Sequence, residues 1–108
     1  MDFVTKKISG RKFLKFETKI FDIVCAKKLI SKTKNKTCAL DCTNIECFKD
    51  TKTLEIIIRN NIALCCASTQ LIQQVSLMCS KNFPKIFMST DDFIADKRML
   101  VKRRFRLV

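Results

Sequence analysis

The chain contains a single glycine, Gly10, and a single proline, Pro84, among its 108 residues. Glycine supplies the positive φ angles of tight turns and of loops that wrap phosphate groups, and proline marks loops and turns. One residue of each kind excludes a glycine-rich phosphate-binding loop and a low-complexity linker. Apolar residues make up 47% of the sequence, which is enough for one modest core. We therefore expect a folded chain and not a disordered tail.

A strand with one apolar face is predicted directly after residue 37. Cys38, Leu40 and Cys42 alternate there with Ala39 and Asp41, and a period of two is typical of a half-buried strand. The seven residues before it, 31–37, are polar and rich in lysine, which indicates a linker.

An amphipathic helix is predicted next, over residues 51–63, with Asp50 or Thr51 as its N-cap. Its apolar positions fall three and four residues apart: Leu54, Ile57, Ile58 and Ile62. The β-branched run Ile56–Ile58 is a competing strand signal, but the capping residues and the spacing favour the helix.

Three more elements are expected towards the C-terminus. Val75, Leu77 and Cys79 alternate with Ser76 and Met78, which predicts a strand. The apolar residues from Phe83 onward first have helical spacing and then alternate, which predicts a helix with Pro84 in its first turn and a last strand. These residues are Phe83, Ile86, Phe87 and Ile94 for the helix, and Val101, Phe105 and Leu107 for the strand.

The predicted fold class is therefore α+β. We expect a small, mostly antiparallel sheet with two helices packed on one face over residues 38–108. Residues 1–37 are expected to form a basic N-terminal extension, in which residues 17–30 can form a short helix.

Charge is the strongest functional signal. The chain has 22 lysine and arginine residues against 10 acidic residues, a net charge of +12. Residues 1–37 hold eleven basic and three acidic residues, residues 38–82 four of each, and residues 83–108 seven and three. Solubility alone needs a net charge of only roughly 2–8 for a small domain. We therefore expect a polyanionic partner, bound at the two basic ends.

The candidate binding residues form one set at each end. The N-terminal set is Lys6, Lys7, Arg11, Lys12 and Lys15, and the C-terminal set is Lys85, Lys97, Arg98, Lys102, Arg103, Arg104 and Arg106. On the last predicted strand, Lys102, Arg104 and Arg106 would project from one face about 6.6 Å apart, and arginine suits bidentate phosphate contact. The alternative is a charged edge strand that only blocks aggregation.

Catalytic and metal chemistry find little support in the composition. Seven cysteines are present but no histidine, so the commonest general base and metal ligand is missing. On a strand, Cys38 and Cys42 would lie about 13 Å apart, too far to share a zinc ion. Asp91 and Asp92, as neighbours on a helix, would diverge by about 100°. We expect no enzyme, no metal and no cofactor, with reduced thiols buried as apolar groups.

The chain has no apolar secretory segment at its N-terminus. It also has no apolar run near the ~18 residues that a membrane span needs. We therefore expect a cytoplasmic protein.

From Cys38 onward the chain resembles the eukaryotic large-subunit ribosomal protein twenty-two family. The locally distinctive match is Leu-Asp-Cys-Thr at residues 40–43, followed by a loop, an aspartate and the start of a helix at Asp50, Leu54 and Glu55. Ile62 falls at the matching helix end. The later matches are Val75, Leu77, Phe83, Lys85, Phe87, Lys97, Arg98, Lys102, Arg106 and Val108.

The resemblance implies a structural constituent of the large ribosomal subunit. Such a protein is non-catalytic, has no small-molecule substrate and no membrane contact, and binds ribosomal RNA beside neighbouring ribosomal proteins. Carried over by position, the RNA contacts are Lys85, Lys97, Arg98, Lys102 and Arg106. Because Asp91 and Asp92 dilute the charge of the preceding helix, the expected surface centres on residues 97–106.

Two other classes remain open. A basic adaptor for acidic proteins or anionic membrane surfaces is motivated by the phenylalanines among the N-terminal lysines, Phe3, Phe13 and Phe16. A cysteine-rich metal module is the other class.

Overall fold

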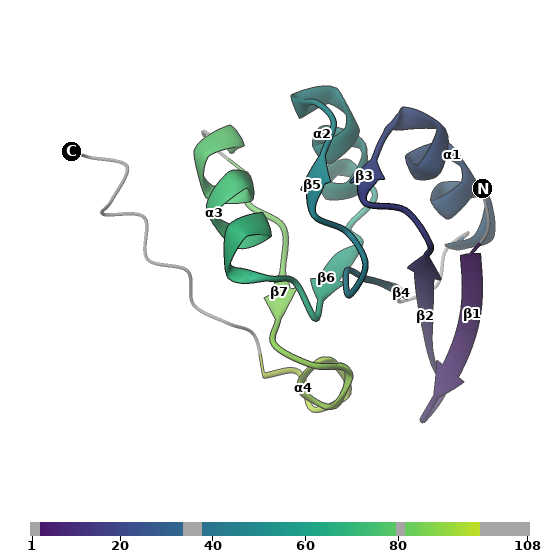
Figure 1. Cartoon of the computed structure of the whole chain (residues 1–108). Helices are drawn as coiled ribbons and strands as arrows, with labels where there is room; N and C mark the ends of the chain where they lie inside the picture. The colour runs from purple at the N-terminus through teal and green to yellow at the C-terminus, as the bar shows by residue number, and fades with distance from the viewer. Residues whose placement is uncertain (1–2, 34–37, 80–81, 98–108) are drawn as a thin grey trace.

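The structure is a computed structural model of the whole chain, and it describes residues 3–33, 38–79 and 82–97. Five strands form a mixed sheet in the order β1-β2-β4-β6-β7 (Figure 1). The strands are β1 (Phe3–Ile8), β2 (Arg11–Phe16), β4 (Cys38–Asp41), β6 (Ala63–Cys65) and β7 (Ile86–Phe87). β1 pairs antiparallel with β2, and the other three pairings are parallel.

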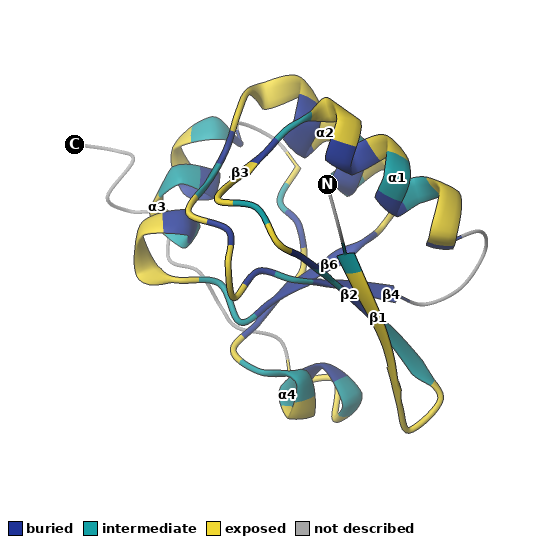
Figure 2. Cartoon of the chain, turned by 45° about the vertical axis from the view of Figure 1, so that its right-hand side comes forward, coloured by how far each residue is buried: buried dark blue, intermediate teal, exposed yellow. Residues whose placement is uncertain are grey.

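Parallel neighbours need a crossover, and helices supply it here. The helices α1 (Ile23–Thr33), α2 (Thr51–Arg59) and α3 (Thr69–Met78) connect β2, β4, β6 and β7 in turn. All three cover the same face of the sheet, and the short helix α4 (Thr90–Ile94) lies against the other face (Figures 1 and 2). A small parallel pair, β3 (Ile20–Phe21) with β5 (Cys47–Phe48), precedes α1 and α2.

Alternation along the strands divides the buried residues between the two faces. Leu14, Leu40 and Leu64 lie in the larger core, which the three long helices close. Phe13 and Phe87 point to the other face, where they meet Phe93 of α4 edge-on with ring centroids 5.2 Å apart in each case. The sheet therefore has a core on both sides.

The α+β class is confirmed, but the sheet differs from the predicted one in being mostly parallel. Three helices are described after residue 38, where two were expected. The short helix that was possible over residues 17–30 is found as α1, shifted to Ile23–Thr33. The predicted strand at residue 38 is confirmed as β4, and its apolar face points to the larger core.

The predicted helix at residue 51 is also confirmed, with Asp50 as its N-cap. The Asp50 carboxylate accepts hydrogen bonds from the backbone N–H of Thr53 at 2.9 Å and from its hydroxyl at 2.7 Å. These bonds hold the pKa of Asp50 below its ordinary value. The helix ends at Arg59, earlier than expected, because Asn61 takes a φ of +56° and reverses the chain.

The strand predicted at Val75, Leu77 and Cys79 is wrong: this segment is the end of α3. Ser68 begins the helix by accepting a hydrogen bond from the N–H of Leu71 at 3.1 Å. Leu71 and Val75, four residues apart, face the core, whereas Leu77 is 71% exposed. The period of two was therefore coincidental, and the helical period decides the fold here.

The helix predicted after Pro84 is replaced by the two-residue strand β7 and the short helix α4. Ile86 and Phe87 are both buried, each in the core of a different face of the sheet, as adjacent residues of a strand must be. Ser89 then caps α4 by accepting from the N–H of Asp92 at 3.1 Å. The strand predicted over residues 101–107 lies outside the described residues.

The N-terminal residues differ from the prediction. Residues 1–37 were predicted to be an extension outside the domain, but the described part of this segment belongs to the fold. β2 lies inside the sheet, between β1 and β4, and Phe16, Phe21 and Leu29 are fully buried in the larger core. β1 and β2 are joined by Ser9 and Gly10, whose φ angles are 52° and 77°. Two positive φ angles in a two-residue loop are the signature of a tight hairpin, and this is where the single glycine is used.

Replacing Phe16 with alanine should lower the free energy of unfolding by about 3–5 kcal/mol, the usual loss for a buried phenylalanine. The side chain is fully buried, stacks on Phe3 with centroids 5.0 Å apart, and meets Phe21 edge-on at 5.2 Å. Ile20→Ala is the control, because Ile20 is 53% exposed, and it should lose less than about 1 kcal/mol. Urea unfolding measures both free energies. If Phe16→Ala lost as little free energy of unfolding as Ile20→Ala, Phe16 would not be packed in the core and residues 3–33 would be a separate extension.

Candidate nucleic-acid interface

The hairpin of β1 and β2 distributes its basic side chains over both faces of the sheet. Lys7 lies opposite Lys12, and both point to the face that carries the helices, together with Leu14. On the other face, Lys6 lies opposite Phe13, Arg11 lies opposite Ile8, and Lys15 lies opposite Val4. The edge of the sheet is therefore basic on both sides.

On the helical face, the like-charged pair Lys7 and Lys12 lies at the end of α1. The ammonium group of Lys12 donates a hydrogen bond to the carbonyl oxygen of Lys32 at 2.8 Å. The last carbonyls of a helix carry partial negative charge, so this position favours a cation. The bond offsets the repulsion between Lys7 and Lys12, and it ties the hairpin to the C-terminal end of α1.

On the opposite face, α4 fixes the position of Arg11. The guanidinium carbon of Arg11 lies 5.8 Å from the ring centroid of Phe93, which is within the range of a cation–π contact. Phe93 in turn packs edge-on against Phe13, with centroids 5.2 Å apart. The half-buried Arg11 is thus held against an aromatic ring, with its charge at the edge of the covered face.

Helix α1 extends the basic surface beyond the residues that we predicted. Lys27 and Lys32 are exposed and Lys28 is half-buried. Asp22 directly precedes the helix, and its carboxylate accepts a hydrogen bond from the N–H of Cys25 at 3.0 Å. That bond holds the pKa of Asp22 below its ordinary value, so one of the few acids here is engaged in capping. The excess of lysine in residues 1–37 was the available signal for this part of the surface.

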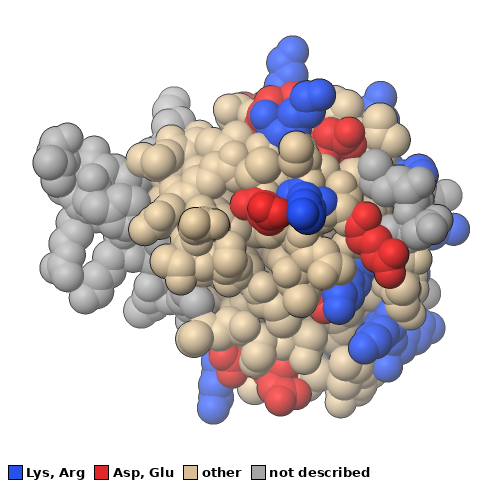
Figure 3. Space-filling view, in the orientation of Figure 1, with Lys and Arg blue, Asp and Glu red and all other residues tan. Residues whose placement is uncertain are grey.

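The net positive charge of the described residues belongs to one contiguous part of the fold. Residues 3–33 carry nine lysines and arginines against two acids, residues 38–79 carry three against four, and residues 82–97 carry two against three. Lys and Arg side chains line the right-hand edge of the molecule in Figure 3, where α1 and β1 lie in Figure 1. Lys6, Lys7, Lys15 and Lys27 form no ion pair with any described residue.

The two predicted basic sets are not brought together within the described residues. Lys85 directly precedes β7, at the opposite edge of the sheet from Lys6 and Lys7. Lys97 follows α4, close in sequence to Asp91, Asp92 and Asp96, and its N–H donates to the carbonyl of Asp92 at 2.8 Å. The rest of the C-terminal set lies outside the described residues: Arg98, Lys102, Arg103, Arg104 and Arg106.

The cysteines act as apolar core groups. All seven are free thiols, and five are buried. Burial raises the pKa of Cys38 to about 11 and raises those of Cys25, Cys42 and Cys65 as well, so these thiols stay protonated at neutral pH. Within residues 3–33, 38–79 and 82–97, no group of three histidine, cysteine or acidic side chains could hold a metal ion.

No protein-family model, curated protein or solved structure matches the chain. In the part of the chain that the structure describes, none of the helices has the length and apolar character that crossing a membrane requires. The basic surface of β1, β2 and α1 wraps around the β1 edge of the sheet and includes side chains on both sides of it. It is here called the basic face.

Proposed function

We propose that this protein is a non-catalytic RNA-binding protein that holds structured RNA through phosphate contacts of the basic face. The observation that carries the proposal is the concentration of nine basic residues against two acids on residues 3–33. Lysines and arginines placed on a rigid scaffold neutralise phosphates and release bound counterions, which drives association without reading sequence.

The scaffold under these residues suits phosphate contact. Lys6 and Lys7 stand on a strand that pairs along its full length with β2, and as adjacent residues of that strand they point to opposite faces of the sheet edge. Lys27 and Lys32 stand on α1, which is fixed to the sheet by its buried side chains Cys25, Ala26 and Leu29. These cations are therefore presented in a fixed arrangement, which reduces the entropy lost on binding.

Base stacking adds little on this face. Phe13 and Phe16 are buried, and Phe3 stacks on Phe16 with its ring half-buried. The described residues of β1, β2 and α1 thus present no exposed aromatic ring to an unpaired base. The absence of exposed rings there favours a structured RNA over an unpaired strand, because the folded RNA itself holds its phosphates in a regular array.

We propose further that the RNA belongs to the large ribosomal subunit, where neighbouring ribosomal proteins would be the other contacts. The support is the resemblance at residues 40–43 and at Asp50, which fall on β4, the loop after it and the cap of α2. The later part of that resemblance needs a strand at Val75, where the chain is helical. The ribosomal assignment therefore has less support than RNA binding itself.

A second candidate is a basic adaptor for acidic proteins or anionic membrane surfaces. It is favoured by the apolar side chains among the lysines, since Val4 and Ile8 of β1 are 48% and 36% exposed. The phenylalanines that first motivated this alternative do not support it, because Phe13 and Phe16 lie in the two cores.

Charge reversal at two matched sets of lysines tests RNA binding by the basic face. Lys6, Lys7 and Lys27 are all exposed on that face, and Lys49, Lys52 and Lys85 are all exposed elsewhere. Changing either set to glutamate alters the net charge equally. The first triple variant should bind a structured RNA at least about 30-fold more weakly, with a salt slope reduced by about 3. The second should lose less than about fivefold.

Fluorescence anisotropy with one labelled RNA hairpin, over a series of salt concentrations, measures both quantities. Equal losses in the two triple variants would show a non-localised attraction and would contradict the proposal. Vesicles of anionic lipid, added as a competitor, separate the two alternatives. They should displace the RNA hairpin if the protein is a membrane adaptor, and they should leave it bound if the protein binds RNA.

Sedimentation tests the ribosomal part separately. In a sucrose gradient of nuclease-free lysate at low salt, the tagged protein should travel with the large subunit and leave it as salt is raised, because phosphate contacts weaken with salt. Protein that remains at the top of the low-salt gradient, while still binding purified RNA, would reject the ribosomal assignment and leave RNA binding in place.

A further inference from the structure

The outer strand of the basic face is exposed on both of its sides. Every residue from Val4 to Gly10 is exposed, so β1 lacks the alternation of a strand that covers a core. Its neighbour β2 is held on both faces, by α1 through Lys12 and by α4 through Arg11. Residues 4–10, here called the ridge, therefore form a projecting edge of the molecule (Figure 2).

The ridge carries positive charge on both sides. Lys7 points to the side of the helices, and Lys6 points to the other side, where Arg11 and Lys15 also lie. The sequence has no acidic residue between positions 3 and 16. A polyanion that lay flat against one side of the ridge would therefore leave the lysine of the other side without a phosphate.

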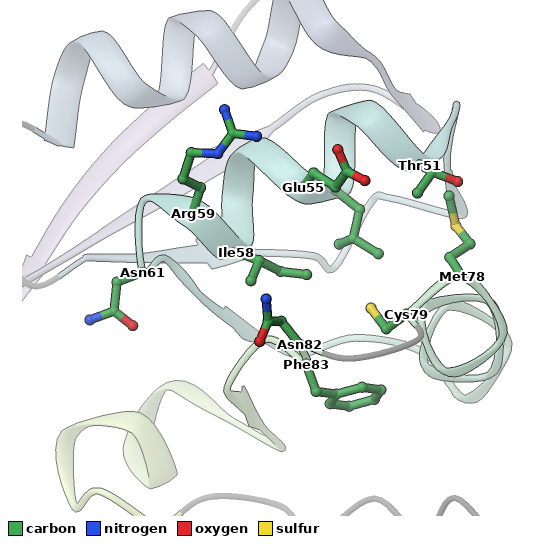
Figure 4. Close-up of a pocket in the computed structure, with 10 residues that line it drawn as sticks. Thr51, Glu55, Ile58, Arg59, Asn61, Met78, Cys79, Asn82 and Phe83 are labelled. Carbon is green, nitrogen blue, oxygen red and sulfur yellow. The ribbon is translucent and has the colours of Figure 1, made fainter.

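The positive charge does not lie in a hollow of the protein. A hollow of about 710 Å³ is formed by α2 on one side and by the end of α3 with Asn82 and Phe83 on the other (Figure 4). Its lining includes one acid, Glu55, and one base, Arg59, so it has no net charge. The basic surface is instead a convex ridge, and a concave surface that fits it must belong to the RNA.

We propose that the ridge enters the groove of an RNA double helix, with Lys6 facing one phosphate backbone and Lys7 facing the other. Groove entry rests on the proposed RNA binding, and it names the part of the RNA that is held. Each groove of a double helix has a phosphate backbone on both of its walls. A groove can therefore pair with both sides of the ridge at once.

The dimensions of the ridge select the kind of groove. β1 has six residues, about 20 Å of strand, and extended lysines on opposite faces of a strand place their ammonium groups roughly 12 Å apart. A major groove of about 12 Å admits a β-ribbon, whereas the major groove of a regular RNA helix is deep but too narrow even for side chains to read. The expected ligand is therefore an RNA helix whose major groove is opened by unpaired nucleotides.

Three labelled RNAs with equal numbers of phosphates test groove entry by fluorescence anisotropy of the full chain. They are a hairpin with an uninterrupted stem, a hairpin with a bulge of about three unpaired nucleotides in its stem, and a strand that cannot pair. The bulged hairpin should bind at least about tenfold more tightly than either of the others, because only its groove lets both lysines reach phosphates.

The outcomes separate groove entry from RNA binding. Equal affinity for the two hairpins, or tightest binding of the unpaired strand, would rule out groove entry and leave RNA binding in place. Failure to bind any of the three RNAs at low salt would overturn the proposed function, and groove entry with it.

Substitution of one lysine at a time tests whether both sides of the ridge are used. Lys6 and Lys7 are adjacent and exposed, neither forms an ion pair with a described residue, and they differ in the face to which they point. Lys6→Gln and Lys7→Gln should each weaken binding of the bulged hairpin by about threefold to tenfold and reduce the salt slope by about 1. Lys52→Gln, on an exposed position of α2, is the matched control and should lose less than about twofold. A loss confined to Lys6→Gln or to Lys7→Gln would place the RNA on one face and contradict groove entry.

Hydroxyl-radical cleavage of the bound hairpin gives an independent readout. Both strands that flank the opened groove should be protected, and protection of a single strand would overturn the proposal. If the lysines only keep the sheet edge from pairing with other chains, both glutamine variants would bind RNA as the parent does and would aggregate faster, which would also contradict it.

Discussion

The parallel pairing of β2 with β4 is the contact on which the rest of the structure depends. Lys12 to Lys15 align with Cys38 to Asp41, and this register joins the basic hairpin to the strands that follow α1. It places Leu14 beside Leu40 in the larger core and Phe13 beside Ala39 on the other face. Without this pairing the first 33 residues would be a charged appendage. With it they become a rigid part of the domain.

The same pairing explains how so much positive charge is tolerated. Alternation along β2 sends Phe13, Leu14 and Phe16 into the cores while Lys12 and Lys15 remain at the surface. Lys12 also finds a carbonyl partner at the end of α1. Like charges are thus separated by the sheet or offset by a helix end, and the basic face does not need acidic neighbours to be stable.

Two elements were predictable from the sequence because local signals and burial agree in them. β4 shows a clean alternation, and α2 has both the capping aspartate and apolar residues at helical spacing. The N-terminal hairpin was missed because its lysines hide the alternation, and because the two-residue turn depends on a positive φ at Ser9 as well as at Gly10.

Sequence failed elsewhere because tertiary contacts decide the structure. Leu77 completes an apparent strand pattern at Val75–Cys79 but is exposed on a helix. β7 is only two residues long, and it exists because β6 offers Leu64 and Cys65 as partners for Ile86 and Phe87. For the candidate site, the hairpin lysines were predictable from charge. The lysine excess of residues 1–37 also includes the lysines of α1, but which of them face outward depends on how α1 packs against the sheet.

The central claim is that the basic face of β1, β2 and α1 is where RNA binds. Amide chemical shifts in a ¹⁵N-labelled sample, followed while a structured RNA is added, report the contact residue by residue. The largest shifts should fall within residues 3–33, at Lys6, Lys7 and Lys27 above all, with α3 nearly unchanged. Shifts that centre on α3 or on residues 82–97, with little change in β1, would contradict the claim.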